Sequence, residues 1–140
     1  MDTTKLYALV SALLAVQLLG LGFWTAATRA KRKTFLNPED AALSKVDGSE
    51  AEHPDVLRAK RAHTNALENA VVFFVLGALY VATQGSKTGA QAYFFTFLGA
   101  RLLHSLFYLL GKQPFRTMSF VVGALACLGM AAHVIRAALS

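Results

Sequence analysis

The chain has 140 residues, of which 55% are hydrophobic and only 16% are charged, a composition too apolar for an ordinary soluble domain. Whole segments are apolar around the full circumference of a helix, which distinguishes membrane helices from the one-sided helices of soluble bundles. The net charge of +6 does not indicate a nucleic-acid partner, because the basic residues flank apolar segments and are not interleaved with aromatic residues. We therefore expect a single all-α domain over residues 1–140, integral to a membrane.

The first apolar segment covers about residues 6–27, long enough to cross a bilayer as a helix. A cleaved signal peptide is the alternative, but the charge order argues against it. Lys5 alone precedes the segment, whereas four basic residues follow it between positions 29 and 33. Trp24, near the end of the segment, is typical of the membrane–water interface.

Residues 28–60 form a polar loop. Asn37-Pro38-Glu39-Asp40 predicts a turn that leads into a short helix with acidic residues in its first turn. Residues 44–54 are rich in Gly, Ser and acidic residues and predict an irregular excursion. His53-Pro54-Asp55 predicts the start of a second long helix, which begins outside the membrane and carries a span over about residues 66–83.

Two further apolar segments, over about residues 91–110 and 117–138, predict the third and fourth spans. Short turns around residues 84–89 and 111–114 join the last three spans, so we expect these helices to be antiparallel neighbours. A bundle of four spans places both termini on one side of the membrane and the first and third loops on the other.

The basic residues are distributed unequally between these two sides. Ten lie on the side of the first and third loops, three (Lys5, Lys87 and Arg136) lie on the other side, and Arg101 lies within the third span. Cytoplasmic loops carry an excess of Lys and Arg. We therefore predict that the first and third loops are cytoplasmic and that both termini lie on the opposite side. The sequence assigns no role to Arg136 or its neighbour His133.

Arg61, Asn65 and Glu68 follow one another at i, i+4 and i+7, which places them on one face of the second helix where it meets the membrane. Such groups are costly beside lipid unless they are paired or bound to a ligand. Glu68 could accept an ammonium group and Arg61 could fork onto a carboxylate. This face therefore suits a zwitterionic ligand.

Arg101, His104 and Tyr108 share one face of the third span, at i, i+3 and i+7. A charge at bilayer depth costs about 2.5–3.5 kcal/mol on insertion scales, so Arg101 should face the bundle or a cavity. Two interpretations stay open: an anion site, and a structural ion pair, for example between Arg101 and Glu68. His104 is equally compatible with a hydrogen-bonded interior histidine.

Arg116 and Thr117 begin the fourth span. A helix N-terminus offers free N–H groups and a partial positive charge, so Arg116 there could form an anion or thiolate site. The alternative is a basic flank that only sets the topology. No metal-binding, Ser-His-Asp or phosphate-loop pattern is present. The single Cys127, inside the last span, is interpreted as a small buried apolar residue.

Four stretches, at these spacings, resemble the family of membrane-associated proteins in eicosanoid and glutathione metabolism (MAPEG), in the branch that holds microsomal glutathione transferase and microsomal prostaglandin E synthase. The resemblance covers nearly the whole chain from Arg29. The four stretches are Asn37-Pro38-Glu39-Asp40, Arg61-Ala62-His63-x-Asn65-x-x-Glu68, Arg101-x-x-His104-x-x-x-Tyr108 and Arg116-x-x-Ser119-Phe120.

The resemblance implies a homotrimer of four-helix subunits, with glutathione bound between neighbouring subunits near the cytoplasmic face. It implies catalytic roles for Arg116, which would face the thiol, for Thr117, and for Asp40, which matches an acid proposed for catalysis in the synthase. Arg101 would be a charge of the site or between helices. The implied glutathione contacts are Arg29, Arg61, Asn65, Glu68, His104, Tyr108 and Arg116.

Three positions depart from the synthase pattern. Thr64 stands where the synthase has an arginine that contacts glutathione, Thr117 replaces a serine, and Phe120 replaces a tyrosine and matches the transferase. The resemblance therefore favours a membrane-bound glutathione transferase that also has glutathione peroxidase activity. Its lipophilic substrate, an electrophile or a peroxide, would enter from the lipid. The alternatives are a glutathione-dependent endoperoxide isomerase like the prostaglandin E synthase, and a non-catalytic membrane module that binds lipid or a partner protein.

Overall fold

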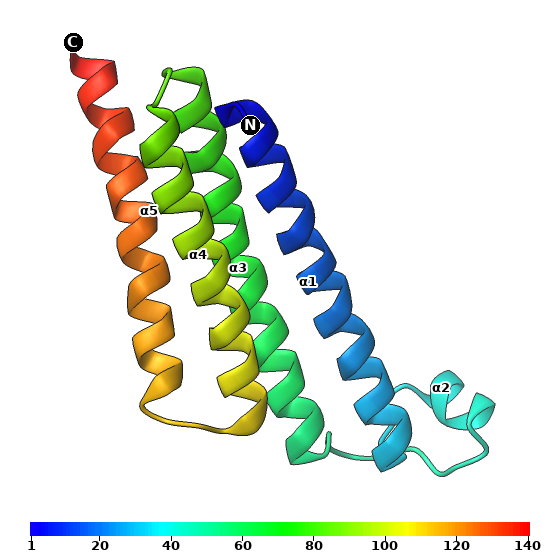
Figure 1. The fold of residues 1–140 in the computed structure, drawn as a ribbon. Coiled ribbons are helices and arrows are strands. Elements are labelled where there is room, and N and C mark those ends of the chain that lie inside the picture. The colour runs from blue at the N-terminus through cyan, green and yellow to red at the C-terminus, as the bar shows by residue number, and fades with distance from the viewer.

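The computed structural model describes residues 1–140 and contains five helices and no strand. Four long helices lie side by side: α1 (Thr3–Arg32), α3 (Pro54–Ala82), α4 (Lys87–Leu110) and α5 (Phe115–Leu139) (Figure 1). The short helix α2 (Pro38–Leu43) lies in the loop between α1 and α3. All four long helices are long and apolar enough to cross a membrane. The predicted all-α bundle of four spans and the predicted short loop helix are thus confirmed.

The helices extend beyond the predicted apolar spans because polar caps lie outside those spans. Asp2 caps α1 by accepting a hydrogen bond from the N–H of Lys5 at 2.7 Å. The largest extension is in α3, which starts at Pro54 and therefore carries about three helical turns before residue 66. The ring of His53 caps this start by accepting from the N–H of Asp55 at 3.1 Å. Arg61 lies in these extra turns, outside the part of α3 that is expected to span the membrane.

Helices α3 and α4 form the centre of the bundle. Both α1 and α5 pack against each of them, while α1 and α5 do not pack against each other. Aromatic rings hold the centre together: the ring centroid of Phe73 on α3 lies 4.7 Å from that of Phe97 and 5.4 Å from that of Phe94, both on α4. All three side chains are fully buried, and Cys127 lies in the same core, as predicted.

Large apolar side chains also cover the outside of the bundle. Phe23 on α1 is 74% exposed and Leu125 on α5 is 60% exposed. A soluble protein rarely exposes a continuous apolar surface of this kind, whereas lipid or a neighbouring subunit accommodates it. The outer surface therefore agrees with four membrane-spanning helices.

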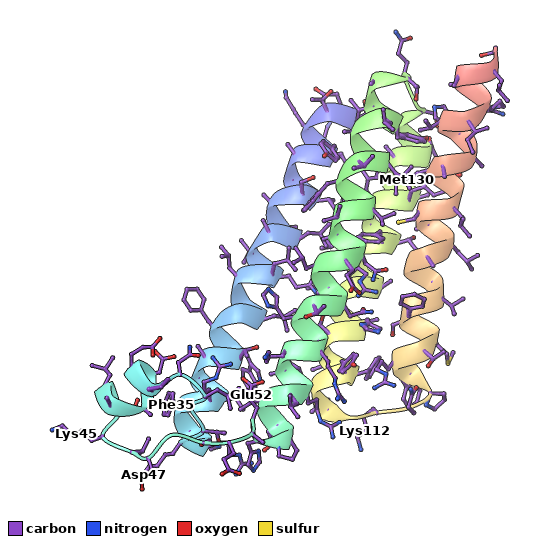
Figure 2. All side chains as sticks on the ribbon, turned by 180° about the vertical axis from the view of Figure 1, so that it is seen from behind. Phe35, Lys45, Asp47, Glu52, Lys112 and Met130 are labelled. Atoms are coloured by element: carbon purple, nitrogen blue, oxygen red, sulfur yellow. The ribbon has the colours of Figure 1, made fainter.

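The two ends of the bundle differ in polarity. Figure 2 shows Lys45, Asp47 and Glu52 of the first loop at the same end as Lys112 of the last loop. Both termini lie at the opposite end, together with the turn between α3 and α4 (Figure 1). The predicted alternation of the loops is therefore confirmed. Which end faces the cytoplasm stays a prediction from the charge distribution.

Impermeant thiol labelling tests this orientation. In a Cys127→Ser background, a cysteine at exposed Asp47 should be labelled only from the cytoplasmic side, because the ten basic residues lie at that end. A cysteine at exposed Lys87, the first residue of α4, is the matched control and should be labelled only from the other side. The reverse pattern in sealed vesicles would overturn the orientation.

Candidate functional site

Arg101 lies in the interior between α1, α3 and α4 and is only 1% exposed. Its Nη2 donates to Oδ1 of Asn65 at 2.5 Å and to the backbone carbonyl of Asn65 at 3.3 Å. From α1, Nε2 of Gln17 donates to the carbonyl of Arg101 at 2.9 Å and to the hydroxyl of Ser105 at 2.8 Å. The prediction that Arg101 faces the bundle interior is confirmed, and its hydrogen bonds join three helices.

The expected ion pair between Arg101 and Glu68 is wrong within one subunit. No carboxylate lies within 4.0 Å of Arg101, and Glu68 is exposed on the surface of α3. The amide oxygen of Asn65 takes the place of the carboxylate. Oδ1 of Asn65 accepts from Arg101, and its Nδ2 makes no hydrogen bond within the subunit, so Nδ2 is free to donate to a ligand.

His104 lies next to this buried cation. Its Nδ1 is 3.4 Å from Nη2 of Arg101, and its ring packs against Tyr108 and Phe120 at centroid distances of 5.6 and 6.1 Å. The side chain is 3% exposed and does not line the Arg116 groove, which lies next to Tyr108. Within one subunit, His104 supports Tyr108 from behind.

Arg116, at the start of α5, lines a groove of about 310 Å³, which we call the Arg116 groove. Its guanidinium carbon lies 4.6 Å from the ring centroid of Tyr108, which is a cation–π distance. The other residues that line the groove are Pro54, Leu57, Arg58, Arg61 and Tyr108.

Gln113 orders the start of α5. In the amide orientation that satisfies both neighbours, its oxygen accepts from Nη2 of Arg116 at 2.6 Å and from Nε at 3.2 Å, while its amide nitrogen donates to the hydroxyl of Thr117 at 3.0 Å. Gln113 therefore holds the two residues predicted to act on a thiol. Gln113 was not predicted from the sequence, although its i, i+3 and i+4 spacing to Arg116 and Thr117 carries the signal.

A second groove, the Glu68 groove, continues from the first one along α3 and has a volume of about 380 Å³. Arg61, Asn65 and Glu68 line it together, so the prediction that they share one face is confirmed. The two grooves share Leu57, Arg61 and Tyr108. The surface between Arg116 and Glu68 is therefore continuous, and it carries cations at one end and a carboxylate at the other. Lys60 and Thr64 also line the Glu68 groove.

A third groove, of about 200 Å³, lies between α1, α2 and α3 and is called the Glu52 groove. Lys60 lines both this groove and the Glu68 groove. Glu52 is 3% exposed and receives Nζ of Lys60 at 2.8 Å and Nη2 of Arg29 at 2.5 Å. The hydrogen bond from Lys60, aided by Arg29, lowers the pKa of Glu52, although burial alone would raise it. The sequence analysis did not identify Glu52 or Lys60.

The Glu52 groove also contains Asp40, whose carboxylate accepts a hydrogen bond from Asn37 at 3.1 Å. Asp40 and Arg29 thus line a different groove from Arg116. One subunit does not bring the predicted catalytic residues Asp40 and Arg116 together.

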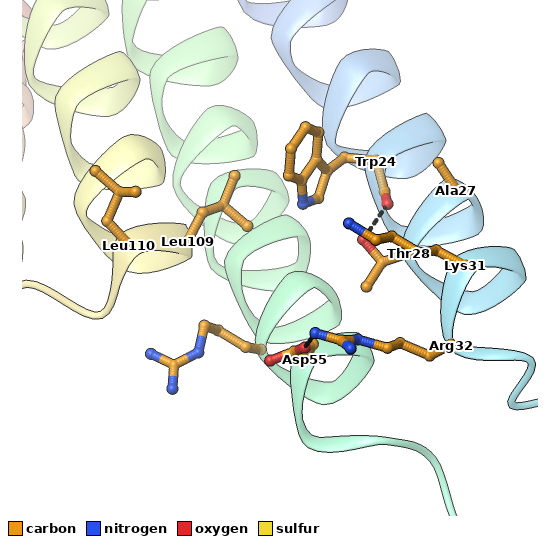
Figure 3. Close-up of a pocket in the computed structure, with 9 residues that line it drawn as sticks. Trp24, Ala27, Thr28, Lys31, Arg32, Asp55, Leu109 and Leu110 are labelled. Carbon is orange, nitrogen blue, oxygen red and sulfur yellow. Dashed lines mark hydrogen bonds and ion pairs between the residues drawn. The ribbon is translucent and has the colours of Figure 1, made fainter.

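The largest groove, of about 400 Å³, opens between α1 and α4 and is called the Trp24 groove (Figure 3). Its upper wall is apolar, with Trp24 facing Leu109, and its lower wall is charged, with Arg32 paired to Asp55 at 2.5 Å. Arg58 lines both this groove and the Arg116 groove. A groove with one apolar wall therefore adjoins the cationic site.

Comparison with known proteins agrees with this arrangement. Residues 7–136 match the model of the MAPEG family. The chain belongs to the MAPEG family. Membership and the four apolar helices together make this MAPEG protein an integral, multi-pass membrane protein.

Its relatives carry two kinds of name. Microsomal glutathione S-transferase 1 of Rattus norvegicus is 35% identical over 146 residues, which cover 99% of this chain and 94% of the relative. The human protein of the same name is 38% identical over 120 residues, covering 82% and 77%. Prostaglandin E synthase of Equus caballus is 32% identical over 131 residues, covering 92% and 85%. Both kinds of relative are enzymes, as the sequence analysis expected.

The Glu52 ion pairs predict a pH-dependent loop. The pKa of Glu52 is lowered in the folded protein. The stabilisation of the folded loop by ionised Glu52 is therefore fully present above the ordinary glutamate pKa of about 4.3, and it is lost as the pH falls through the lowered pKa. A spin label on a cysteine at Asp47, in the Cys127→Ser background, should gain mobility only below about pH 4. Glu52→Gln should give the mobile spectrum at pH 7, because a charge-assisted hydrogen bond contributes about 1.5–3 kcal/mol, here at the low end since Lys60 is half exposed.

Glu50→Gln is the matched control, because Glu50 is exposed and forms no ion pair. In the Glu50→Gln variant, the spin label at position 47 should be as immobile at pH 7 as in the parent protein. An immobile label in Glu52→Gln at pH 7 would contradict a role for Glu52 in ordering the loop.

Proposed function

We propose that this protein is a membrane-bound glutathione transferase, with glutathione peroxidase activity, that acts on lipophilic electrophiles and peroxides. The observation that carries the proposal is the continuous surface formed by the Arg116 and Glu68 grooves, with Arg116 and Glu68 at its two ends. The relatives named microsomal glutathione S-transferase 1 support the same activity.

Glutathione carries one ammonium group, two carboxylates and one thiol, and this surface offers a partner for each. Glu68 would accept the ammonium, and Arg61 and Lys60 would hold carboxylates by charge-assisted hydrogen bonds. Nδ2 of Asn65, which Arg101 leaves free by holding Oδ1, would donate to the same end of the peptide. Arg101 is then a positioning residue, because it acts on glutathione only through Asn65.

The thiol would lie beside Arg116. An unperturbed thiol has a pKa near 8.5, so the reactive thiolate is the minor form at neutral pH. The fixed charge of Arg116 favours the thiolate, and the hydroxyl of Thr117 adds a neutral donor. In conjugation, the thiol proton goes to water, the sulfur forms a bond to the electrophilic carbon, and the leaving group departs with the electron pair of its bond.

The Trp24 groove is the proposed approach for the lipophilic substrate. Its wall of Trp24, Leu109 and Leu110 offers an apolar surface at the edge of the membrane. Arg58 connects it with the Arg116 groove, where the sulfur would react. Entry from the lipid would bring an apolar electrophile to the thiolate without passage through water.

We further propose that the protein is a homotrimer with sites between subunits. Support comes from the exposed apolar outer surface and from the placement of Arg29 and Asp40, which do not reach the Arg116 groove of their own subunit. Chemical cross-linking in a mild detergent should end at the trimer. A fully active monomer after dilution would contradict a shared site.

A second candidate, the glutathione-dependent isomerisation of an endoperoxide, is favoured by the prostaglandin E synthase relative. Thr64 disfavours this second activity, because it lines the Glu68 groove at the position where the resemblance to the synthase predicts an arginine. Product analysis with an endoperoxide and glutathione separates the two activities. A non-catalytic membrane module would give no turnover in either assay.

The proposed activity predicts turnover of glutathione with 1-chloro-2,4-dinitrobenzene by the purified protein. Ultraviolet absorbance of the thiolate, titrated against pH with glutathione bound, should give a pKa one to two units below 8.5, which corresponds to about 1.4–2.7 kcal/mol. Arg116→Gln should raise this pKa and lower kcat more than it raises KM, because it removes a full charge beside the sulfur. Thr117→Val should have a smaller effect.

Lys112→Gln is the matched control for Arg116→Gln, because it removes a positive charge from an exposed position of the loop that precedes α5. It should leave the thiolate pKa and kcat close to those of the parent. An unchanged thiolate pKa in Arg116→Gln would assign this arginine to topology alone. Absence of any turnover would reject the enzyme.

A further inference from the structure

A cavity of about 350 Å³ lies at the end of the bundle opposite to the Arg116 groove and is called the far-end cavity. It is open to the surface and is lined by the end of α3, the start of α4 and the last turns of α5. The residues of interest in its wall are Tyr80, Ser86, Tyr93, Gly129, His133 and Arg136. The proposed transferase activity uses none of these residues.

The aromatic wall of this cavity is packed in place. The ring centroid of Tyr80 lies 4.5 Å from that of His133 and 5.8 Å from that of Tyr93. The hydroxyl of Tyr80 donates to the carbonyl of Ser86 at 3.3 Å. Any side chain at Gly129 would overlap the ring of Tyr93, so glycine at this position permits the close approach. The cavity is therefore a formed site between packed rings.

His133 contributes a polar atom that the protein leaves unsatisfied. Its Nε2 is buried and has no hydrogen-bond partner. Nearly all buried polar atoms in folded proteins have a partner, so an isolated one beside a cavity calls for a group from outside the chain. His133 lines the far-end cavity, so a ligand bound there would supply such a partner.

The charges around the cavity select an anion. Arg136 lies one turn after His133 on α5, and no carboxylate lies within 4.0 Å of its guanidinium. No Asp or Glu lines the cavity. The hydroxyl of Ser86 and the first turn of α4, with its partial positive charge, face the same region. The only formal charge that lines the cavity is therefore positive, which favours an anion over a cation.

The position in the membrane indicates the class of anion. Helix α5 has 25 residues and is therefore about 37 Å long, which exceeds the hydrocarbon thickness of about 30 Å. Arg136 lies about 31 Å from the start of α5, so its guanidinium can reach the headgroup layer, where phosphate groups are concentrated. We propose that the far-end cavity binds a phosphate group through Arg136 and His133, with Ser86 and the start of α4 as further donors.

The phosphate can belong to a lipid headgroup or can be free in solution, and two probes separate these sources. Calorimetric titration of the detergent-solubilised protein with inorganic phosphate and with dihexanoyl phosphatidic acid should give saturable binding, one site per subunit, for at least one probe. Equal affinities indicate that the phosphate group alone is recognised. Much tighter binding of the lipid indicates a headgroup site.

Two variants test the residues. Arg136→Gln removes the charge from an exposed residue without disturbing the core, and His133→Phe removes Nε2 but keeps an aromatic ring against Tyr80. Each should weaken binding by about tenfold or more, the usual effect of losing a charge-assisted hydrogen bond. Thermal unfolding like that of the parent shows that the variants fold.

Lys87→Gln is the matched control, because Lys87 is exposed at the same end of the bundle but does not line the cavity. Its affinity for either probe should remain within about twofold of the parent, since an exposed charge contributes little. Three results would overturn the proposal: no saturable binding of either probe, an unchanged affinity in folded Arg136→Gln, or an equal loss in Lys87→Gln.

Discussion

A guanidinium buried among apolar helices has to find acceptors inside the protein, because lipid offers none and an unpaired charge there is costly. Arg101 meets this constraint only through Nη2, which donates to the side chain and backbone carbonyl of Asn65 on α3, while its buried Nε and Nη1 have no partner within the subunit. Gln17 donates to the backbone carbonyl of Arg101 and so joins it to α1. These hydrogen bonds fix the positions of α1, α3 and α4 relative to one another along the bundle axis. The same register places Tyr108, two turns after Arg101 on α4, beside Arg61 on α3.

The proposed chemistry depends on that register. The guanidinium of Arg116 packs on the ring of Tyr108 and donates hydrogen bonds to Gln113 in the loop before α5. The cation is therefore positioned before any ligand binds. Preorganised charge is effective because it does not have to reorient when the thiolate forms. The Trp24 groove joins this polar surface to an apolar one through Arg58, which fits an enzyme with one water-soluble and one lipophilic substrate.

The sequence predicted the four spans and the shared face of Arg61, Asn65 and Glu68, because apolar length and helical spacing are local properties. It did not predict partners across helices. The spacing of Arg101 shows that it points inward, but not that Asn65 instead of Glu68 would accept its hydrogen bonds. Glu52 was missed for the same reason: its partners Arg29 and Lys60 belong to two different helices, which only the folded loop brings together.

The central claim is that Arg116 holds the sulfur of glutathione at the cationic end of this surface. A structure of the glutathione-bound protein in lipid, with the sulfur located by its anomalous scattering, tests this claim most directly. We expect a sulfur within about 4 Å of the Arg116 guanidinium, the usual limit for an ion pair, with the γ-glutamyl ammonium at Glu68. A sulfur bound elsewhere, with Arg116 still engaged only by Tyr108 and Gln113, would contradict it.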